Sequence, residues 1–162
     1  MLRLSCSVER LTELHNIDTP LAQGGDGPLA QGAALQGPEG STPDGRLLYF
    51  ERQPGAGAVR LFISPLSGAE ATPLFEPRFT YTNARFSPDG TWLAYVSDES
   101  GALDVSVVRW PLSHGRMRVS TTGGSRPRWS RDRRTLLFLF GAGLFRVPVP
   151  SAGPGKTSLV LA

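Results

Sequence analysis

The tripeptide Pro-Asp-Gly occurs twice in this chain, each time directly before a run of apolar residues. The two copies are Pro43-Asp44-Gly45 before residues 46–50 and Pro88-Asp89-Gly90 before residues 91–96. A degraded third copy contains Asp132 and precedes residues 134–139. The three aspartates are 45 and 43 residues apart. A unit of nearly constant length that contains a tight turn and a strand-like run therefore repeats along the chain.

The best preserved unit divides into four short strands joined by turns. The predicted strands are residues 84–87, 91–97, 105–110 and 117–120. In the Pro-Asp-Gly turn, proline presets φ, aspartate can bond backbone amides and glycine accepts a positive φ. Residues 127–130 take the place of 84–87 one unit later. A period of about 40 to 45 residues with four strands is typical of a β-propeller blade, so we expect an all-β fold.

Residues 85–101, 107–111 and 119–132 resemble the TolB-type (WD-repeat-like) β-propeller repeat. They are most similar to the propeller segments that follow the kinase domain in some bacterial serine/threonine protein kinases. The resemblance covers about residues 41–150, and it implies a binding and scaffolding role without a catalytic residue. Arg133 departs from the pattern, because the repeat usually has glycine there, so we expect the third turn to be relaxed or of another type.

The length of the chain limits the number of blades. A closed propeller needs at least about four blades, and 162 residues at about 43 residues each supply fewer. We therefore predict a partial propeller of about three four-stranded blades over residues 43–150, which this chain alone does not close. The predicted blade units are 43–85, 86–128 and 129–150.

The remaining segments are predicted from composition and periodicity. Residues 16–42 are rich in Gly, Pro and Gln and are predicted to be linker-like, and residues 151–162 form a C-terminal tail. In the N-terminal segment 1–15, apolar residues alternate with polar ones, which favours a short strand. The helical alternative stays open, because Val8, Leu11 and Leu14 also fit one helical face.

Positive charge is concentrated in one part of the chain. Residues 1–108 carry seven arginines and 13 acidic residues, whereas residues 109–134 carry eight arginines and one acidic residue. Such a band can bind an anionic partner, and its candidate patch is Arg126, Arg128, Arg131, Arg133 and Arg134. We favour the alternative that these arginines decorate strand edges and loops, because no nucleic-acid motif accompanies them. Nucleic acid is therefore not an expected partner.

The sequence contains no complete catalytic, nucleotide-binding or metal-binding set. Gly153-Pro-Gly-Lys-Thr157 resembles a phosphate-binding loop, but Pro150 stands where the leading glycine is required. A Gly-x-Ser-x-Gly nucleophile elbow is absent from the sequence. With two histidines and the single cysteine Cys6, neither a zinc site nor an intrachain disulfide is expected. We expect no enzymatic activity, no cofactor and no metal.

Two residue groups have both a functional and a structural interpretation. Asp98, Glu99 and Asp104 could hold a hard cation, but we favour solvated carboxylates at a hairpin turn. Trp92, Trp110 and Trp129 could form a stacking surface for bases or sugars. Because they recur at blade positions, we expect them to pack in the core.

The leading hypothesis is a non-enzymatic interaction or scaffold module, a fragment of a larger sensor or kinase-linked protein. The alternatives are an accessory propeller of a prolyl-peptidase-like hydrolase and a polyanion binder that uses the arginines of residues 109–134. The expected partners are a protein, the remaining blades or a second copy of the chain. The N-terminus lacks the apolar run of a signal peptide and no membrane span is found, so the chain as written is expected in the cytoplasm. A fragment of a larger TolB-like or kinase-linked protein would instead be periplasmic or extracytoplasmic.

Overall fold

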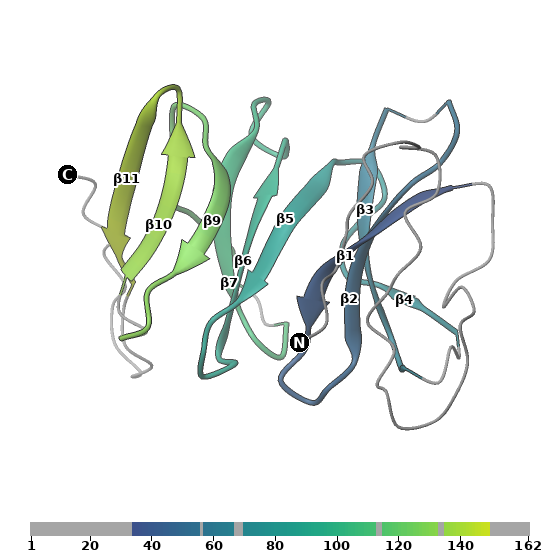
Figure 1. Ribbon diagram of the computed structural model, residues 1–162. Coiled ribbons are helices and arrows are strands. Elements are labelled where there is room, and N and C mark those ends of the chain that lie inside the picture. Colours follow the sequence, from purple (N-terminus) through teal and green to yellow (C-terminus); the bar gives the residue numbers. More distant parts are fainter. Residues whose placement is uncertain (1–33, 56, 67–69, 113–114, 133–134, 150–162) are drawn as a thin grey trace, which may run out of the picture.

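The computed structural model describes residues 34–55, 57–66, 70–112, 115–132 and 135–149. Within these residues every regular element is a β-strand, and the strands form three antiparallel sheets (Figure 1). Sheet 1 contains β1 (Leu35–Ser41), β2 (Leu47–Arg52), β3 (Val59–Ser64) and β4 (Thr72–Pro73). Sheet 2 contains β5 (Tyr81–Phe86), β6 (Trp92–Ser97), β7 (Asp104–Arg109) and β8 (Met117–Arg118). Sheet 3 contains β9 (Ser125–Trp129), β10 (Thr135–Phe140) and β11 (Gly143–Pro148). The prediction of an all-β fold is confirmed.

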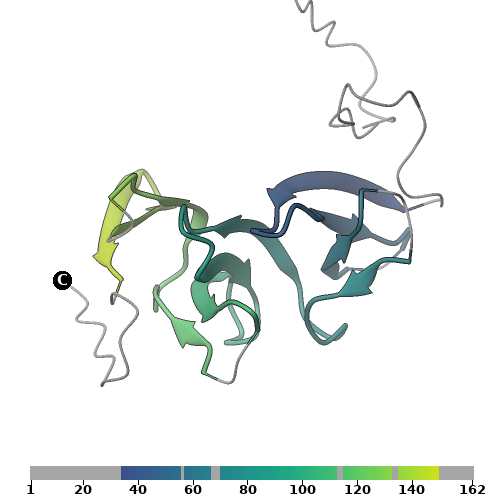
Figure 2. The same cartoon turned by 90° about the horizontal axis from the view of Figure 1, so that it is seen from below.

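The three sheets stand side by side as an arc. Within each sheet the strands pair in sequence order, so that each sheet is an antiparallel meander. The first strands of the sheets are neighbours, because β5 contacts both β1 and β9. Figure 2 shows the arc from below, with its two ends apart and the chain not closed into a ring.

The core lies between the sheets in two layers. Between sheets 1 and 2 the buried side chains are Leu48, Leu61, Ile63, Tyr81, Ala84, Leu93, Tyr95 and Val108. Between sheets 2 and 3 they are Trp92, Ala94, Val96, Val105, Val107, Val119, Leu136, Phe138, Val147 and Val149. Successive side chains of a strand point to opposite faces, and both faces of sheet 2 are covered. All six residues of β6 are therefore buried.

The predicted boundaries differ from those of the sheets. Residues 35–41, which composition assigns to the linker-like segment 16–42, form strand β1 and pair with β2. The linker prediction is wrong there, because the Gly and Gln residues of this segment carry the backbone N–H and C=O groups that strand pairing uses, and Pro38 still carries a C=O. The predicted units start at the turns, so the first two each combine the later strands of one sheet with the first strand of the next, and the third contains β10 and β11. The predicted N-terminal strand within 1–15 and the tail 151–162 lie outside the described residues.

Candidate interaction surface

The three sheets share one hydrogen-bonded turn between their first and second strands. A hydroxyl group donates to the aspartate two residues later, from Thr42 to Asp44, from Ser87 to Asp89 and from Ser130 to Asp132. The same hydroxyl oxygen accepts the backbone N–H of Arg46, Trp92 or Thr135 at 2.9, 3.0 and 3.1 Å. Gly45 and Gly90 have φ angles of +83° and +70°, which is why these two turns use glycine. Arg133 and Arg134, in the third turn, lie outside the described residues.

Hydrogen bonds also stabilise the ionised form of two turn aspartates. The bonds from Ser87 and, secondarily, Thr91 hold the pKa of Asp89 below its usual value. The bond from Thr42 has the same effect on the pKa of Asp44. A carboxyl group with a lowered pKa contributes stability that is present above its unfolded pKa and lost as the pH falls through its folded pKa. These hydrogen bonds therefore stabilise the turns at Asp44 and Asp89 when the two carboxyl groups are ionised.

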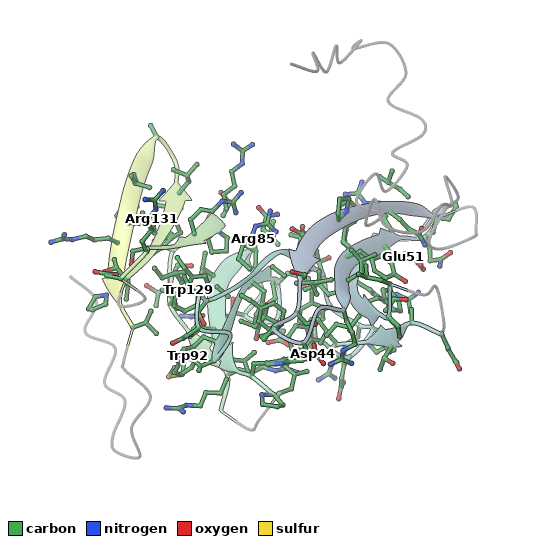
Figure 3. All side chains as sticks on the ribbon, turned by 60° about the horizontal axis from the view of Figure 1, so that its bottom comes forward. Asp44, Glu51, Arg85, Trp92, Trp129 and Arg131 are labelled. Carbon is green, nitrogen blue, oxygen red and sulfur yellow. The ribbon has the colours of Figure 1, made fainter. Side chains whose placement is uncertain are left out.

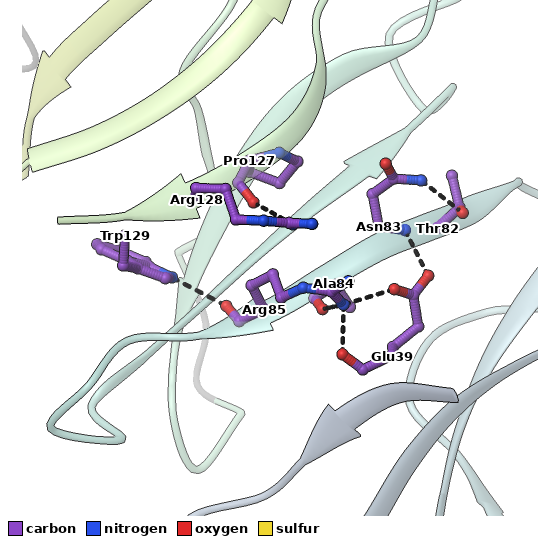
Figure 4. A network of polar contacts seen from close by, with 8 residues as sticks. All are labelled: Glu39, Thr82, Asn83, Ala84, Arg85, Pro127, Arg128 and Trp129. Atoms are coloured by element: carbon purple, nitrogen blue, oxygen red, sulfur yellow. Dashed lines mark hydrogen bonds and ion pairs between the residues drawn. The ribbon is translucent and has the colours of Figure 1, made fainter. Parts of the chain in front are cut away.

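Side chains of the first strands connect neighbouring sheets. Glu39 of β1 accepts the backbone N–H of Asn83 at 2.7 Å and forms an ion pair with Arg85 of β5 at 2.6 Å (Figure 4). On the other side of β5, the indole N–H of Trp129 in β9 donates to the backbone oxygen of Arg85 at 2.9 Å. The carboxylate of Glu39 is almost fully buried. Arg85 thus contacts residues of both neighbouring sheets.

Replacement of Glu39 by alanine is expected to lower the free energy of unfolding by about 1 to 3 kcal/mol, because it removes the acceptor of a part-buried backbone N–H and of a guanidinium. Urea denaturation followed by tryptophan fluorescence measures this change. The matched control is Glu76→Ala, since Glu76 forms an exposed pair with Arg78 at 3.6 Å and should change stability by less than about 0.5 kcal/mol. Equal effects of the two substitutions would contradict a role of Glu39 in linking the sheets.

Arg128 of β9 occupies the place that Arg85 has in β5. Each guanidinium donates to the backbone oxygen of the preceding residue, Ala84 at 2.6 Å and Pro127 at 3.0 Å. Ala84 stands in β5 where Glu39 stands in β1, three residues before the turn hydroxyl. No carboxylate of the described residues therefore pairs with Arg128.

The arginines of residues 109–134 fall into two groups in the structure, those that contact other side chains of the chain and those that are exposed. Arg109 lies over the ring of Trp92 at 4.9 Å, Arg116 pairs with Glu99, and Arg118 lies 3.6 Å from the Asp104 carboxylate. Of the predicted anionic-partner patch, Arg126, Arg128 and Arg131 are exposed, on β9 or just after it. Figure 3 labels Arg131 near sheet 3, on the opposite side of the molecule from Glu51 of sheet 1. Half of the described arginines of the band are thus engaged with other side chains of the chain.

The acidic group after β6 is bonded within the protein. Asp98 accepts the backbone N–H of Thr80 at 2.8 Å, and Glu99 accepts the hydroxyl of Tyr81 at 2.5 Å. Asp104 is buried and accepts Ser100 Oγ at 2.6 Å, Ser120 Oγ at 3.1 Å and the Gly123 N–H at 2.9 Å. The prediction of solvated carboxylates is therefore wrong for Asp104, because Ser120 and Gly123 of a later turn and Ser100 of the preceding loop enclose it. Among the described residues no group of three metal-ligating side chains is present.

The tryptophans pack against neighbouring side chains. Trp92 is buried between sheets 2 and 3, and Trp129 packs against the same cluster (Figure 3). Trp110 meets the ring of Phe86 edge-on, with ring centres 5.1 Å apart. The prediction of core packing is confirmed for Trp92.

Sheet 3 has one uncovered face, whose centre is apolar except for Arg146 of β11. Leu136, Phe138 and Val147 point toward sheet 2. Alternation along the strands places Leu137 and Leu139 of β10 on the opposite face, together with Leu144 of β11, which pairs with Leu139. Leu144 is 68% exposed, and Leu137 and Leu139 are half-buried. The described residues contain no further sheet that packs on this face.

The register identifies which residues take the same positions in the other sheets. Leu48 of sheet 1 and Ala94 of sheet 2 correspond to Leu137, and Leu61 and Val105 correspond to Leu144. These counterparts are buried against the following sheet, with at most 1% of each side chain exposed. The uncovered face of sheet 3 is thus the surface that the first two sheets use to bind their neighbour.

Because about three blades do not close a propeller, the sequence predicts that at least one end exposes a blade face rich in Phe, Leu and Val. It does not specify that sheet 3 carries this face, since nothing in the strand-like runs of the third repeat distinguishes them from the buried runs of the first two. In the described part of the chain, no helix is long and apolar enough to cross a membrane.

Comparison with known proteins identifies the fold. No protein-family model and no curated protein matches the chain. Among solved structures, the "putative TolB" from Agrobacterium tumefaciens matches with a TM-score of 0.52 and 20% identity over 67% of this chain and 40% of that one. TolB from Acinetobacter baumannii matches with a TM-score of 0.51 and 17% identity over 66% of this chain and 28% of that one. The chain therefore spans less than half the length of either structure, and its fold is a partial TolB-like β-propeller. The predicted similarity to kinase-linked propellers stays a prediction.

Proposed function

We propose that this chain is a non-enzymatic β-propeller module that binds a further β-sheet through the uncovered face of sheet 3. The observation that carries the proposal is the exposure of Leu144, at a position where the first two sheets bury an apolar residue against the next sheet. Burial of apolar area drives such packing at about 25 cal/mol per Å². The partner is a sheet with a complementary apolar face, supplied by the remaining blades or by a second copy of this chain.

The interactions between the described sheets support this role. Repeat units that each contact only their neighbours leave a binding surface at the terminal unit. Exposed apolar patches of this kind mark association sites in soluble proteins. The proposed absence of catalysis rests on the sequence, which contains no nucleophile elbow and no complete phosphate-binding loop.

The isolated chain is expected to self-associate through this face. Size-exclusion chromatography with light scattering should show an apparent mass that rises with concentration, and Leu139→Glu should shift the protein toward monomer, because a charge on the face opposes its burial. Leu103→Glu, at an exposed position of the loop before β7, is the matched control and should leave the mass unchanged. A monomer at all concentrations that also binds no dye for exposed apolar surface would contradict the proposal.

Polyanion binding is the weaker alternative. It is disfavoured because Arg109, Arg116 and Arg118 are engaged with an aromatic ring or a carboxylate of the chain. The remaining exposed arginines, Arg126 and Arg128 of β9 with the adjacent Arg131, support at most weak binding that falls steeply with salt. The hydrolase-accessory alternative has no observation of the described residues in its favour.

A further inference from the structure

The carboxylate of Glu39 lies in a small binding site that β5 forms next to β1. The site has two donors, the backbone N–H of Asn83 at 2.7 Å and the guanidinium of Arg85 at 2.6 Å (Figure 4). Hydrogen bonds to an ionised acceptor are stronger than those between neutral groups. Only 7% of the Glu39 side chain is exposed, so the two donors hold its carboxylate away from solvent.

Strand β9 repeats the backbone of this site. Asn83 lies four residues before the turn hydroxyl of Ser87, and Arg126 lies four residues before that of Ser130. Both residues have a left-handed backbone, with φ of +55° and +51°, and both lie at a register irregularity between the first and second strands of their sheets. This backbone is uncommon outside glycine, and in the described part of the chain these are the two such residues. The N–H of Arg126 therefore takes the place in sheet 3 that the N–H of Asn83 has in sheet 2.

The guanidinium of the site is repeated as well. Arg128 stands two residues beyond the left-handed residue of β9, as Arg85 does in β5. Each guanidinium donates to the carbonyl oxygen of the residue before it, so the two arginines make the same local contact. Strands β5 and β9 are in contact, and Figure 4 shows Arg128 on the strand next to Ala84 and Arg85. Sheet 3 thus carries both donors that hold the carboxylate of Glu39 in sheet 2.

The described residues supply no carboxylate to the second pair of donors. Ala84 stands in β5 where Glu39 stands in β1, and its methyl group cannot accept a hydrogen bond. Within the described ranges, no side chain accepts the N–H of Arg126, and the guanidinium of Arg128 bonds only to the carbonyl of Pro127. Arg126 and Arg128 are both exposed, so a carboxylate from another molecule can reach the two donors.

We propose that the N–H of Arg126 and the guanidinium of Arg128 bind a carboxylate side chain of a protein partner. A carboxylate is the ligand class because the same two donors already hold a glutamate elsewhere in this chain. Arg131 is exposed just after β9 and adds positive charge, which attracts an acidic segment more than a neutral one. The inference does not rest on the proposed function, which concerns the leucines of the uncovered face.

Acetate tests the site in nuclear magnetic resonance spectra of the isotope-labelled chain. Titration with acetate at neutral pH and low salt should move the Arg126 amide proton downfield in a saturable way, because an ionised acceptor deshields the proton that it binds. Acetamide, the neutral counterpart of acetate, should leave this resonance in place. The readout is one amide of β9, so its failure is distinguishable from failure of the proposed function, which is measured as apparent mass.

Three substitutions separate the two donors from general attraction by positive charge. Arg128→Gln should weaken acetate binding by about tenfold or more, because it removes the charged donor. Arg131→Gln removes the same charge nearby and should weaken binding by less than about threefold. Arg126→Asn keeps the N–H and suits the left-handed backbone, as Asn83 does in sheet 2, so it should also change binding by less than about threefold. Equal losses in Arg128→Gln and Arg131→Gln would overturn the proposal in favour of diffuse attraction.

The site beside Glu39 provides a positive control. In the Glu39→Ala variant the donors of β5 lose their carboxylate, so acetate should also shift the amide of Asn83. An Arg126 amide that acetate does not move in the unaltered chain would overturn the proposal, whatever happens at Asn83.

A capped peptide with a single glutamate distinguishes a protein side chain from a small free carboxylate. The peptide should shift the Arg126 amide as acetate does, and its glutamine counterpart should not. Binding of acetate without binding of the glutamate peptide would overturn the assignment of the site to a protein partner.

Discussion

Replacement of Leu93 by alanine is expected to lower the free energy of unfolding by about 2 to 5 kcal/mol, the range for truncation of a buried leucine. Leu93 lies in β6, is 0% exposed and packs between sheets 1 and 2. Truncation of Leu93 leaves a cavity between sheets 1 and 2. Backbone hydrogen bonds fix the strands of both sheets, so the sheets cannot easily move to fill this cavity. Urea denaturation followed by circular dichroism measures the change.

The matched control for this substitution is Leu103→Ala. Leu103 is 51% exposed in the loop before β7, so its truncation removes little buried area and should change stability by less than about 0.5 kcal/mol. If Leu93→Ala were as mild as Leu103→Ala, sheets 1 and 2 would not be packed against each other in solution. A single transition with a lowered midpoint in the Leu93→Ala variant is the expected form of the result.

Replacement of Gly90 by valine is expected to destabilise the fold by about 2 to 4 kcal/mol, because two costs add at this position. The φ of Gly90 is +70°, where a β-branched residue is strained. A Cβ atom at Gly90 would also lie 2.5 Å from Cγ of Pro43, in the corresponding turn of sheet 1. Thermal and urea denaturation of the variant measure the sum of these costs.

Two other glycines separate the contributions. Gly45 has a similar φ of +83° but open space around its Cα, so Gly45→Val should show the backbone strain alone, about 1 to 2 kcal/mol. Gly57 also has open space around its Cα, and its Gly57→Val variant should be nearly neutral. If Gly90→Val were no more destabilising than Gly45→Val, the two turns would not be in contact.

Local sequence determines the turns and the strands of sheet 2. Pro, Asp and Gly have conformational and hydrogen-bonding preferences that act within a few residues, so Asp44 and Asp89 predict hairpins without knowledge of the rest of the chain. The run 91–97 predicts β6, because apolar and aromatic residues favour a strand that is buried on both faces. The third turn keeps its hydroxyl–carboxylate bond between Ser130 and Asp132 without the usual glycine.

Long-range contacts decide the features that the sequence could not predict. Glu39 lies in a segment of Gly and Pro composition, and its partners Asn83 and Arg85 are 44 and 46 residues away. Asp104 is buried because Ser120 and Gly123 approach it from a later turn. No local preference specifies either contact.

The sequence by itself determined that this chain is an all-β repeat with hairpins at Asp44, Asp89 and Asp132, because turn chemistry and strand periodicity are local properties. Only the tertiary structure decided that β1 belongs to sheet 1, that Arg85 contacts residues of both neighbouring sheets, and that Leu144 is exposed where Leu61 and Val105 are buried. The physical reason is that burial depends on which surface lies opposite a residue. Similar apolar runs therefore become core in sheets 1 and 2 and an uncovered face in sheet 3.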